Sequence, residues 1–208
     1  MEEKSLQPKQ LASFVFDNSA SCSKEKLSAL MRGFRALAAE CAENAMLEWE
    51  LICYDAFSPA VVKSFADTEV APVYAGRTPL LGRAVLCATD RIAARAAALR
   101  ADGVALYRPM MFILSDGFTL DDTEEAVLRL ENMEHSAELT YLPFKLTKKL
   151  YTERLQSLDR TKRMIEIKDG CIEQFFAFVR GVLERRAALA PDQGLKFQKS
   201  DFEGWAEL

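Results

Sequence analysis

Apolar residues follow two spacings along the chain, and these spacings predict alternating strands and helices. Short continuous runs of apolar, β-branched and aromatic residues predict buried strands, at residues 11–16, 50–57, 61–65, 109–115, 139–144 and 163–167. Between them, apolar residues recur every three or four positions, which is the spacing of one helical face. This spacing predicts helices at residues 23–41, 79–100, 122–133, 147–158 and 172–183. Residues 122–125 resemble a capping box that opens the third of these helices.

The order of the predicted elements indicates the fold class. Strands and helices alternate along the chain, except for one hairpin formed by the second and third strands. Such alternation is typical of a mostly parallel sheet with helices on both faces. We therefore expect an α/β, Rossmann-like, doubly wound fold with a six-stranded sheet, in which one edge strand is antiparallel.

The same pattern suggests how the chain is divided. We expect residues 1–10 to be a frayed N-terminus, residues 11–186 to form the domain, and residues 187–208 to be a C-terminal tail. The tail loses helical periodicity but keeps large aromatic residues, which are Phe197, Phe202 and Trp205. Both self-packing on the domain and docking on another chain are consistent with these residues.

Composition excludes several classes of protein. The chain has 208 residues, 50% of them apolar and 28% charged, with a net charge of −4. This profile is typical of a soluble globular domain and gives no electrostatic support for nucleic-acid binding. The single histidine, His135, excludes a metal centre built on two or more histidines. The chain has five cysteines and no C-x-x-C motif, which is consistent with free thiols in a reducing compartment. It has no apolar stretch of about 20 residues and no basic, apolar leader. We therefore expect a cytoplasmic protein without a membrane partner.

Candidate chemistry lies in the loops that follow the predicted strands. In open α/β sheets, ligands bind outside the carboxyl ends of the strands. Residues 17–21 read D-N-S-A-S, residues 115–117 read S-D-G, and residues 76–79 read G-R-T-P. Carboxylate and hydroxyl oxygens of this kind suit one Mg²⁺ or Mn²⁺ ion, which would keep open positions in its coordination shell.

Together these segments resemble the von Willebrand factor type A (VWA) domain, over about residues 11–185. The resemblance rests on the D-x-S-x-S run, the Gly-x-Thr-Pro loop and an Asp-Gly pair ending an apolar strand. It implies a metal-ion-dependent adhesion site (MIDAS) with five ligands, which are Asp17, Ser19, Ser21, Thr78 and Asp116. The hydroxyls would bind the metal directly, and the aspartates directly or through water. The resemblance further implies a binding module rather than a catalyst, in which an Asp or Glu of a partner protein completes the shell.

Within that family, the sequence is most similar to short, single-domain bacterial proteins of the tellurium-resistance TerY type. This similarity is carried by residues 74–80, residues 108–117 and the Phe175-Phe176 pair. It implies a role as a scaffold in a tellurite-resistance and stress-response system.

Three positions depart from the common pattern of the family. Ala20 replaces a glycine, Cys22 stands where methionine is common, and Arg77 precedes the threonine where a small residue is usual. Two aspartates and a divalent cation sum to about zero charge, so Arg77 makes the mouth of the site positive and favours an acidic ligand. We take Arg77 and Asn18 as the candidate partner-binding residues.

Other interpretations of the same residues stay open. The aspartates, serines and Thr78 could simply cap helices and turns. A Mg²⁺-dependent phosphoester hydrolase using Asp17 or Asp116 is a second function, although no general base or phosphate-binding glycine loop accompanies them. A nucleotide-binding Rossmann domain shares the strand pattern but lacks the G-x-G-x-x-G fingerprint.

Overall fold

The computed structural model describes residues 7–18, 23–41, 46–54, 59–65, 67, 69–71, 73, 80–117, 119–146, 164–191 and 193–207. The helices within these ranges are α1 (Lys24–Cys41), α2 (Leu81–Ala101), α3 (Glu124–His135), α5 (Ile172–Ala187) and a short 3₁₀ helix, η1 (Lys199–Asp201). The strands are β1 (Gln10–Asp17), β2 (Leu47–Tyr54), β3 (Pro59–Lys63), β4 (Met110–Ser115), β5 (Thr140–Lys145), β6 (Ile165–Ile167) and β7 (Ala206–Glu207). The helix predicted at residues 147–158 lies outside the described residues.

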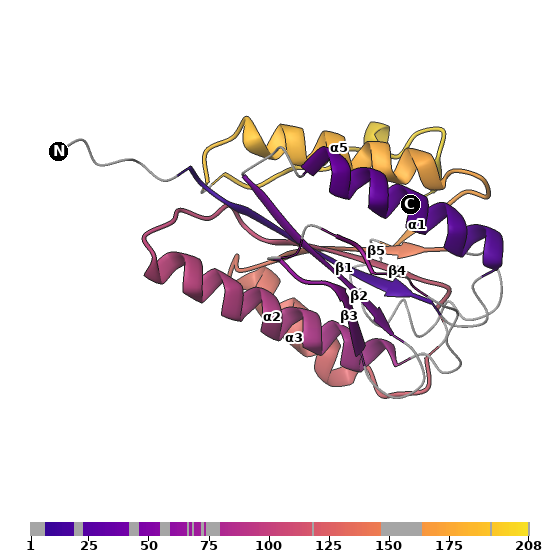
Figure 1. The fold of residues 1–208 in the computed structure, drawn as a ribbon, viewed down its shortest axis with the longest axis horizontal. Coiled ribbons are helices and arrows are strands. Elements are labelled where there is room, and N and C mark those ends of the chain that lie inside the picture. The colour runs from indigo at the N-terminus through magenta and orange to yellow at the C-terminus, as the bar shows by residue number, and fades with distance from the viewer. Residues whose placement is uncertain are drawn as a thin grey trace.

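One sheet organises the chain, with the strand order β3-β2-β1-β4-β5-β6-β7. The five inner strands are parallel, and β3 and β7 pair antiparallel to them at the two edges. Helices α1 and α5 cover one face of the sheet, and α2 and α3 cover the other (Figure 1). The mostly parallel α/β prediction is therefore confirmed. The sheet has seven strands where six were predicted, because residues 206–207 add β7 beside β6.

The face under α1 and α5 is an aromatic layer. Phe14 stacks on Phe112 with ring centroids 5.0 Å apart, and Phe34 meets Phe176 edge-on, also at 5.0 Å. Such pairs contribute about 0.5–1.5 kcal/mol each beyond the area that they bury. Gly33 is required here, because a Cβ at that position would lie 2.0 Å from the Phe176 ring. Helices α1 and α5 are thus packed closely through apolar contact.

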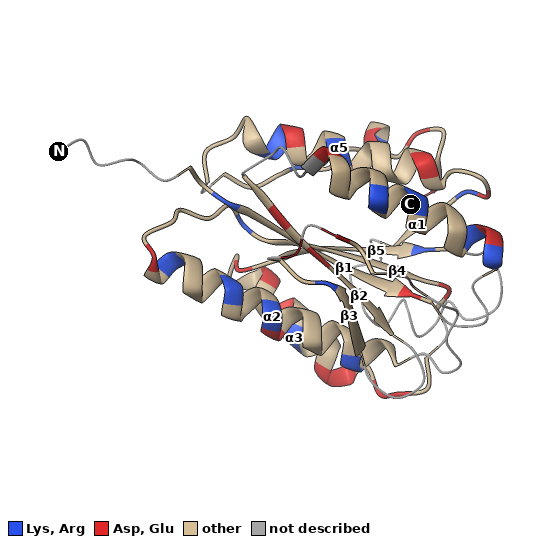
Figure 2. Cartoon of the chain, viewed as in Figure 1, with Lys and Arg blue, Asp and Glu red and all other residues tan. Residues whose placement is uncertain are grey.

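The face under α2 holds a buried polar network. Glu50 is fully buried, and its carboxylate accepts hydrogen bonds from Ser13 Oγ at 2.8 Å and from Arg91 Nε at 2.6 Å. Two residues earlier on β2, the Glu48 carboxylate accepts two hydrogen bonds from the Arg95 guanidinium, at 2.7 and 3.0 Å. Elsewhere the strands carry few charged residues (Figure 2). The two pairs therefore fix α2 against β2.

The C-terminal tail packs on its own chain. Phe202 and Trp205 are only 4% and 8% exposed and contact Phe178 of α5, with ring centroids 5.1 and 5.3 Å away. The buried guanidinium of Arg186 lies over the Tyr107 ring and donates to the carbonyl of Pro191. These contacts explain why β7 can form at the sheet edge.

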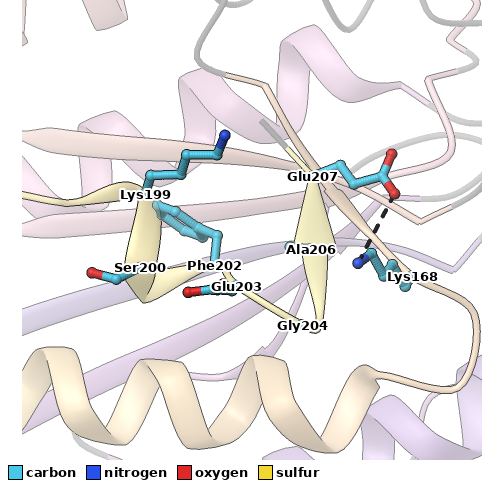
Figure 3. A pocket seen from close by; sticks show the side chains of 8 residues that line it. All are labelled: Lys168, Lys199, Ser200, Phe202, Glu203, Gly204, Ala206 and Glu207. Carbon is cyan, nitrogen blue, oxygen red and sulfur yellow. Dashed lines mark ion pairs between the residues drawn. The ribbon is translucent and has the colours of Figure 1, made fainter.

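Beside β7 the tail borders an open pocket of about 810 Å³. Charged residues of both signs line it, including Lys168, which lies 4.0 Å from Glu207, and Lys199 and Glu203 (Figure 3). Strands β5 and β6 separate this edge from β4.

Among the described residues, no helix has the length and apolar character needed to cross a membrane.

Deleting the residues after Pro191 should lower the melting temperature, because it exposes the surface of α5 that Phe202 and Trp205 cover. Trp205→Ala alone should cost about 3–5 kcal/mol of unfolding free energy, the usual range for a buried tryptophan. Leu128→Ala is the control, since Leu128 is 45% exposed on α3 and surface changes stay within about 0.5 kcal/mol. Denaturant unfolding measures all three, and an unchanged stability after truncation would contradict this packing.

The two glutamates of β2 should give opposite pH dependences. Burial raises the pKa of Glu50 above its ordinary value of 4.5 despite its hydrogen bonds to Arg91 and Ser13. Burial acts in the same direction on Glu48, but the hydrogen bond and charge of Arg95 outweigh it and lower the pKa of Glu48 below 4.5. The Glu50 contribution to stability is therefore complete below the unfolded pKa and is lost as pH rises through the folded pKa. The Glu48 contribution is present above the unfolded pKa and is lost as pH falls through the folded pKa.

Unfolding free energies of wild type, Glu50→Gln and Glu48→Gln from pH 4 to pH 7 measure both effects. The difference between wild type and Glu50→Gln should fall as pH rises, and the difference between wild type and Glu48→Gln should grow. Equal slopes for the two variants would contradict the opposite shifts.

Candidate metal centre

Three neighbouring parallel strands end in polar residues at one edge of the sheet. Asp17 ends β1, Tyr54 ends β2 and Ser115 ends β4, and all three are fully buried. Asp17 is paired with Tyr54 in the sheet register, and Phe16 is paired with Leu114. Because side chains alternate along a strand, the Asp17, Tyr54 and Ser115 side chains share the face that α2 covers.

The Asp17 carboxylate is tied to the end of β4. Its Oδ2 accepts hydrogen bonds from the Asp116 backbone N–H at 3.4 Å and from Ser115 Oγ at 3.5 Å. Ser115 Oγ in turn accepts a bond from the Gly117 N–H at 3.0 Å. Gly117 has φ = 91°, a left-handed conformation that favours glycine. This turn places Asp116, which is 4% exposed, next to Asp17 although the two are 99 residues apart in the sequence.

Tyr54 places a hydroxyl group beside the two aspartates. Burial raises the pKa of Tyr54 well above its ordinary value, and the charge of Asp17 raises it further. Ser115 and Asp17 are near neighbours of the hydroxyl, but among the described residues it has no partner within hydrogen-bond geometry. A buried hydroxyl without a partner is unusual in a folded protein. It leaves one hydrogen-bonding group available at the edge that carries the carboxylates.

The structure brings together part of the predicted ligand set. Asp17 and Asp116 lie in one hydrogen-bonded cluster, and Asn18, 4% exposed, directly follows Asp17. Three of the predicted ligands, Ser19, Ser21 and Thr78, lie outside the described residues, as does Arg77. Their roles stay predictions.

Sequence reasoning gave no role at this edge to Tyr54 or Thr119, and it included Ser115 only through the S-D-G segment at residues 115–117. Tyr54 was assigned only to an apolar strand. A polar atom at the last position of each parallel strand was the available signal. The capping box predicted at residues 122–125 does not include Asp121, whose carboxylate accepts hydrogen bonds from the first turn of α2.

The residues present fit a hard divalent cation. Asp17 and Asp116 are nearly fully buried at the same edge of the sheet, and a carboxylate at this depth favours a nearby cation. Oxygen donors with carboxylates are the preferred surroundings of Mg²⁺. The described residues contain no group of three or more His, Cys, Asp or Glu side chains able to hold a metal.

Comparisons with known proteins identify the fold. No family model matches the sequence, and no curated protein matches it. The N-terminal domain of TFIIH p34 is similar in structure with a TM-score of 0.59 at 12% identity, covering 83% of this chain and 96% of that one. Proximal thread matrix protein 1 from the mussel byssus is similar with a TM-score of 0.56 at 11% identity, covering 86% of this chain and 48% of that one.

The VWA domain of SpRpn10 gives a TM-score of 0.53 at 9% identity, covering 91% of this chain and 100% of that one. At these identities the similarity shows the fold alone. The chain has a VWA-like α/β fold, with Asp17 and Asp116 at the carboxyl edge of its sheet.

Tyr54→Phe and Ser115→Ala should differ in their effects on the metal-free protein. Tyr54→Phe removes a hydroxyl without a hydrogen bond, so the unfolding free energy should stay unchanged or rise by about 1 kcal/mol. Ser115→Ala leaves the buried Gly117 N–H without its acceptor and should cost about 1–3 kcal/mol. Denaturant unfolding in the presence of a chelator measures both. A loss above about 1 kcal/mol in Tyr54→Phe would mean that this hydroxyl has a partner.

Proposed function

We propose that this chain is a metal-dependent protein-interaction module. One Mg²⁺ or Mn²⁺ ion is held at the carboxyl edge of the sheet by the five predicted ligands, Asp17, Ser19, Ser21, Thr78 and Asp116. A partner protein presents an Asp or Glu side chain that completes the coordination shell. The proposal makes the chain a binding protein and not an enzyme.

One observation carries the proposal. Asp17, at the end of β1, and Asp116, directly after β4, lie in one buried cluster at the edge where α/β sheets bind ligands. The VWA-like fold supports it, because Asp17 ends the first strand and the Asp116-Gly117 pair follows the fourth, in the order that the resemblance requires. Electrostatics support it too: the carboxylates favour a cation, and Arg77 would favour an acidic partner over a basic one.

The biological setting is a finer part of the proposal. The similarity of residues 74–80 and residues 108–117 to the TerY type supports a cytoplasmic scaffold in a bacterial tellurite-resistance and stress-response system. The partner is then another protein of that system with an exposed acidic residue.

Metal titration and partner capture test the proposal. Isothermal calorimetry should detect one Mg²⁺ or Mn²⁺ site in the wild type, and Asp17→Asn or Asp116→Asn should weaken it at least tenfold by removing a charged ligand. Asp102→Asn is the matched control, because Asp102 is an exposed carboxylate after the C-terminal end of α2. A wild-type chain that binds neither ion would overturn the metal-dependent module.

Partner capture from a lysate of the source cell should then require the metal. A partner should be retained with Mg²⁺ and lost with a chelator or with Asp17→Asn. Arg77→Ala should weaken retention of the partner and leave metal affinity unchanged. Retention of the same partners under all conditions would place the binding face elsewhere. Turnover of a generic phosphate ester that disappears in Asp17→Asn would favour the hydrolase instead.

A further inference from the structure

The first turn of α2 is held by residues that lie 38 or more positions later in the chain. The Leu81 N–H donates to Thr119 Oγ1 at 3.0 Å. The Gly82 and Arg83 N–H groups donate to the two carboxylate oxygens of Asp121, at 3.2 and 2.8 Å. The Thr119 hydroxyl itself donates to Asp121. We call this arrangement the Thr119–Asp121 clamp.

The clamp replaces a local cap. A helix leaves its first four N–H groups without intrahelical partners, and a Ser, Thr, Asp or Asn before the helix usually binds one of them. Here the N-cap residue is Leu80, which forms no side-chain cap. The first turn of α2 therefore takes its side-chain acceptors from the segment that follows Asp116.

The clamp is closely packed as well as hydrogen-bonded. Thr119 is fully buried. A Cβ at Gly82 would lie 2.3 Å from the carbonyl oxygen of Asp122, so only glycine lets the backbone of the two segments approach this closely. Helix α2 cannot shift along the 119–122 segment without breaking these contacts.

The clamp lies at the base of two predicted ligand loops. Thr78 is three residues before Leu81, and Asp116 is three residues before Thr119. Three residues span at most about 11 Å of extended chain, so fixing Leu81 to Thr119 limits how far Thr78 can lie from Asp116. Both carboxylate oxygens of Asp121 accept backbone hydrogen bonds, which makes Asp121 a holder of the loops and not a ligand.

From this geometry we propose that Thr119 and Asp121 are positioning residues that bring the Thr78 loop to the Asp17–Asp116 cluster and so raise the metal affinity. The inference rests on the proposed function, because it assigns a role toward the same metal site. It adds two residues that neither bind the metal nor belong to the D-x-S-x-S pattern.

Magnesium or manganese affinity, measured by calorimetry on the full chain, tests the clamp. Asp121→Ala should weaken metal binding about tenfold, because the two loops are no longer fixed at their bases. Asp121→Asn keeps one acceptor oxygen and should lose less. Thr119→Val keeps the shape but not the hydrogen bonds and should resemble Asp121→Ala. The Thr119 and Asp121→Asn variants keep the test valid if Asp121→Ala does not fold.

Asp122→Ala is the matched control for Asp121→Ala. Asp122 Oδ1 accepts a hydrogen bond from the Glu124 N–H at 2.9 Å, at the start of α3. Loss of that cap should lower the melting temperature in the same way as loss of the clamp, since each cap is worth about 1 kcal/mol, but should leave metal affinity unchanged. If this control has a lower melting temperature but normal metal affinity, lost stability alone does not weaken metal binding. Weaker metal binding in the clamp variants then reflects positioning and not a purely structural role.

The outcomes distinguish this inference from the proposed function. If the wild type binds metal and Asp121→Ala and Thr119→Val bind it equally well, the clamp inference alone is wrong. Equal weakening in Asp122→Ala and Asp121→Ala would also overturn it, because stability would then account for the effect. If the wild type binds neither ion, the proposed metal site fails and the clamp inference fails with it.

Discussion

The parallel pairing of β1 with β2 on one side and with β4 on the other is the constraint on which the rest of the structure depends. Parallel strands all end at the same edge, so the polar residues that end them must meet there. Water does not reach Asp17, Tyr54 or Ser115, and buried polar groups must find partners in one another or in a ligand. The acidic cluster is thus a direct consequence of strand order.

The two faces of the sheet hold their helices by different forces. Contact between Gly33 and the Phe176 ring keeps α1 close to α5, so apolar packing fixes this layer. Helix α2 is instead fixed by polar groups, with Arg91 bound to Glu50 near its middle and Asp121 bound at its first turn. Apolar contacts are nondirectional, whereas hydrogen bonds fix direction as well as distance. The face that carries the candidate site is therefore the face whose helix is positioned by directional bonds.

Local patterns in the sequence predicted most of the fold, and long-range contacts account for what they missed. The continuous apolar run at residues 109–115 predicts a buried strand, and the three-four spacing from Leu27 to Cys41 predicts a helix with one buried face. Both signals are local, because neighbouring residues of one element are buried together. Strand β7 has two residues and no period to detect, and its presence depends on Trp205 packing against Phe178. The predicted strand ends alone were enough to place Asp17 and Asp116 at one edge of the sheet. It could not identify the Asp121 bond to α2, because no local signal joins residues 39 positions apart.

Electrostatics connect the fold to the proposed metal. Asp17 and Asp116 are buried at the ends of adjacent strands, where surroundings less polar than water strengthen the attraction of a carboxylate for a cation. The same charges help to raise the pKa of Tyr54, which keeps that hydroxyl neutral and able to donate. Because Asp17 is already held by the Asp116 N–H, a cation would not have to order this side chain, which limits the conformational entropy lost at Asp17. A cation that binds only the folded chain then stabilises it in proportion to the logarithm of its concentration. The burial of these carboxylates thus favours the proposed ion.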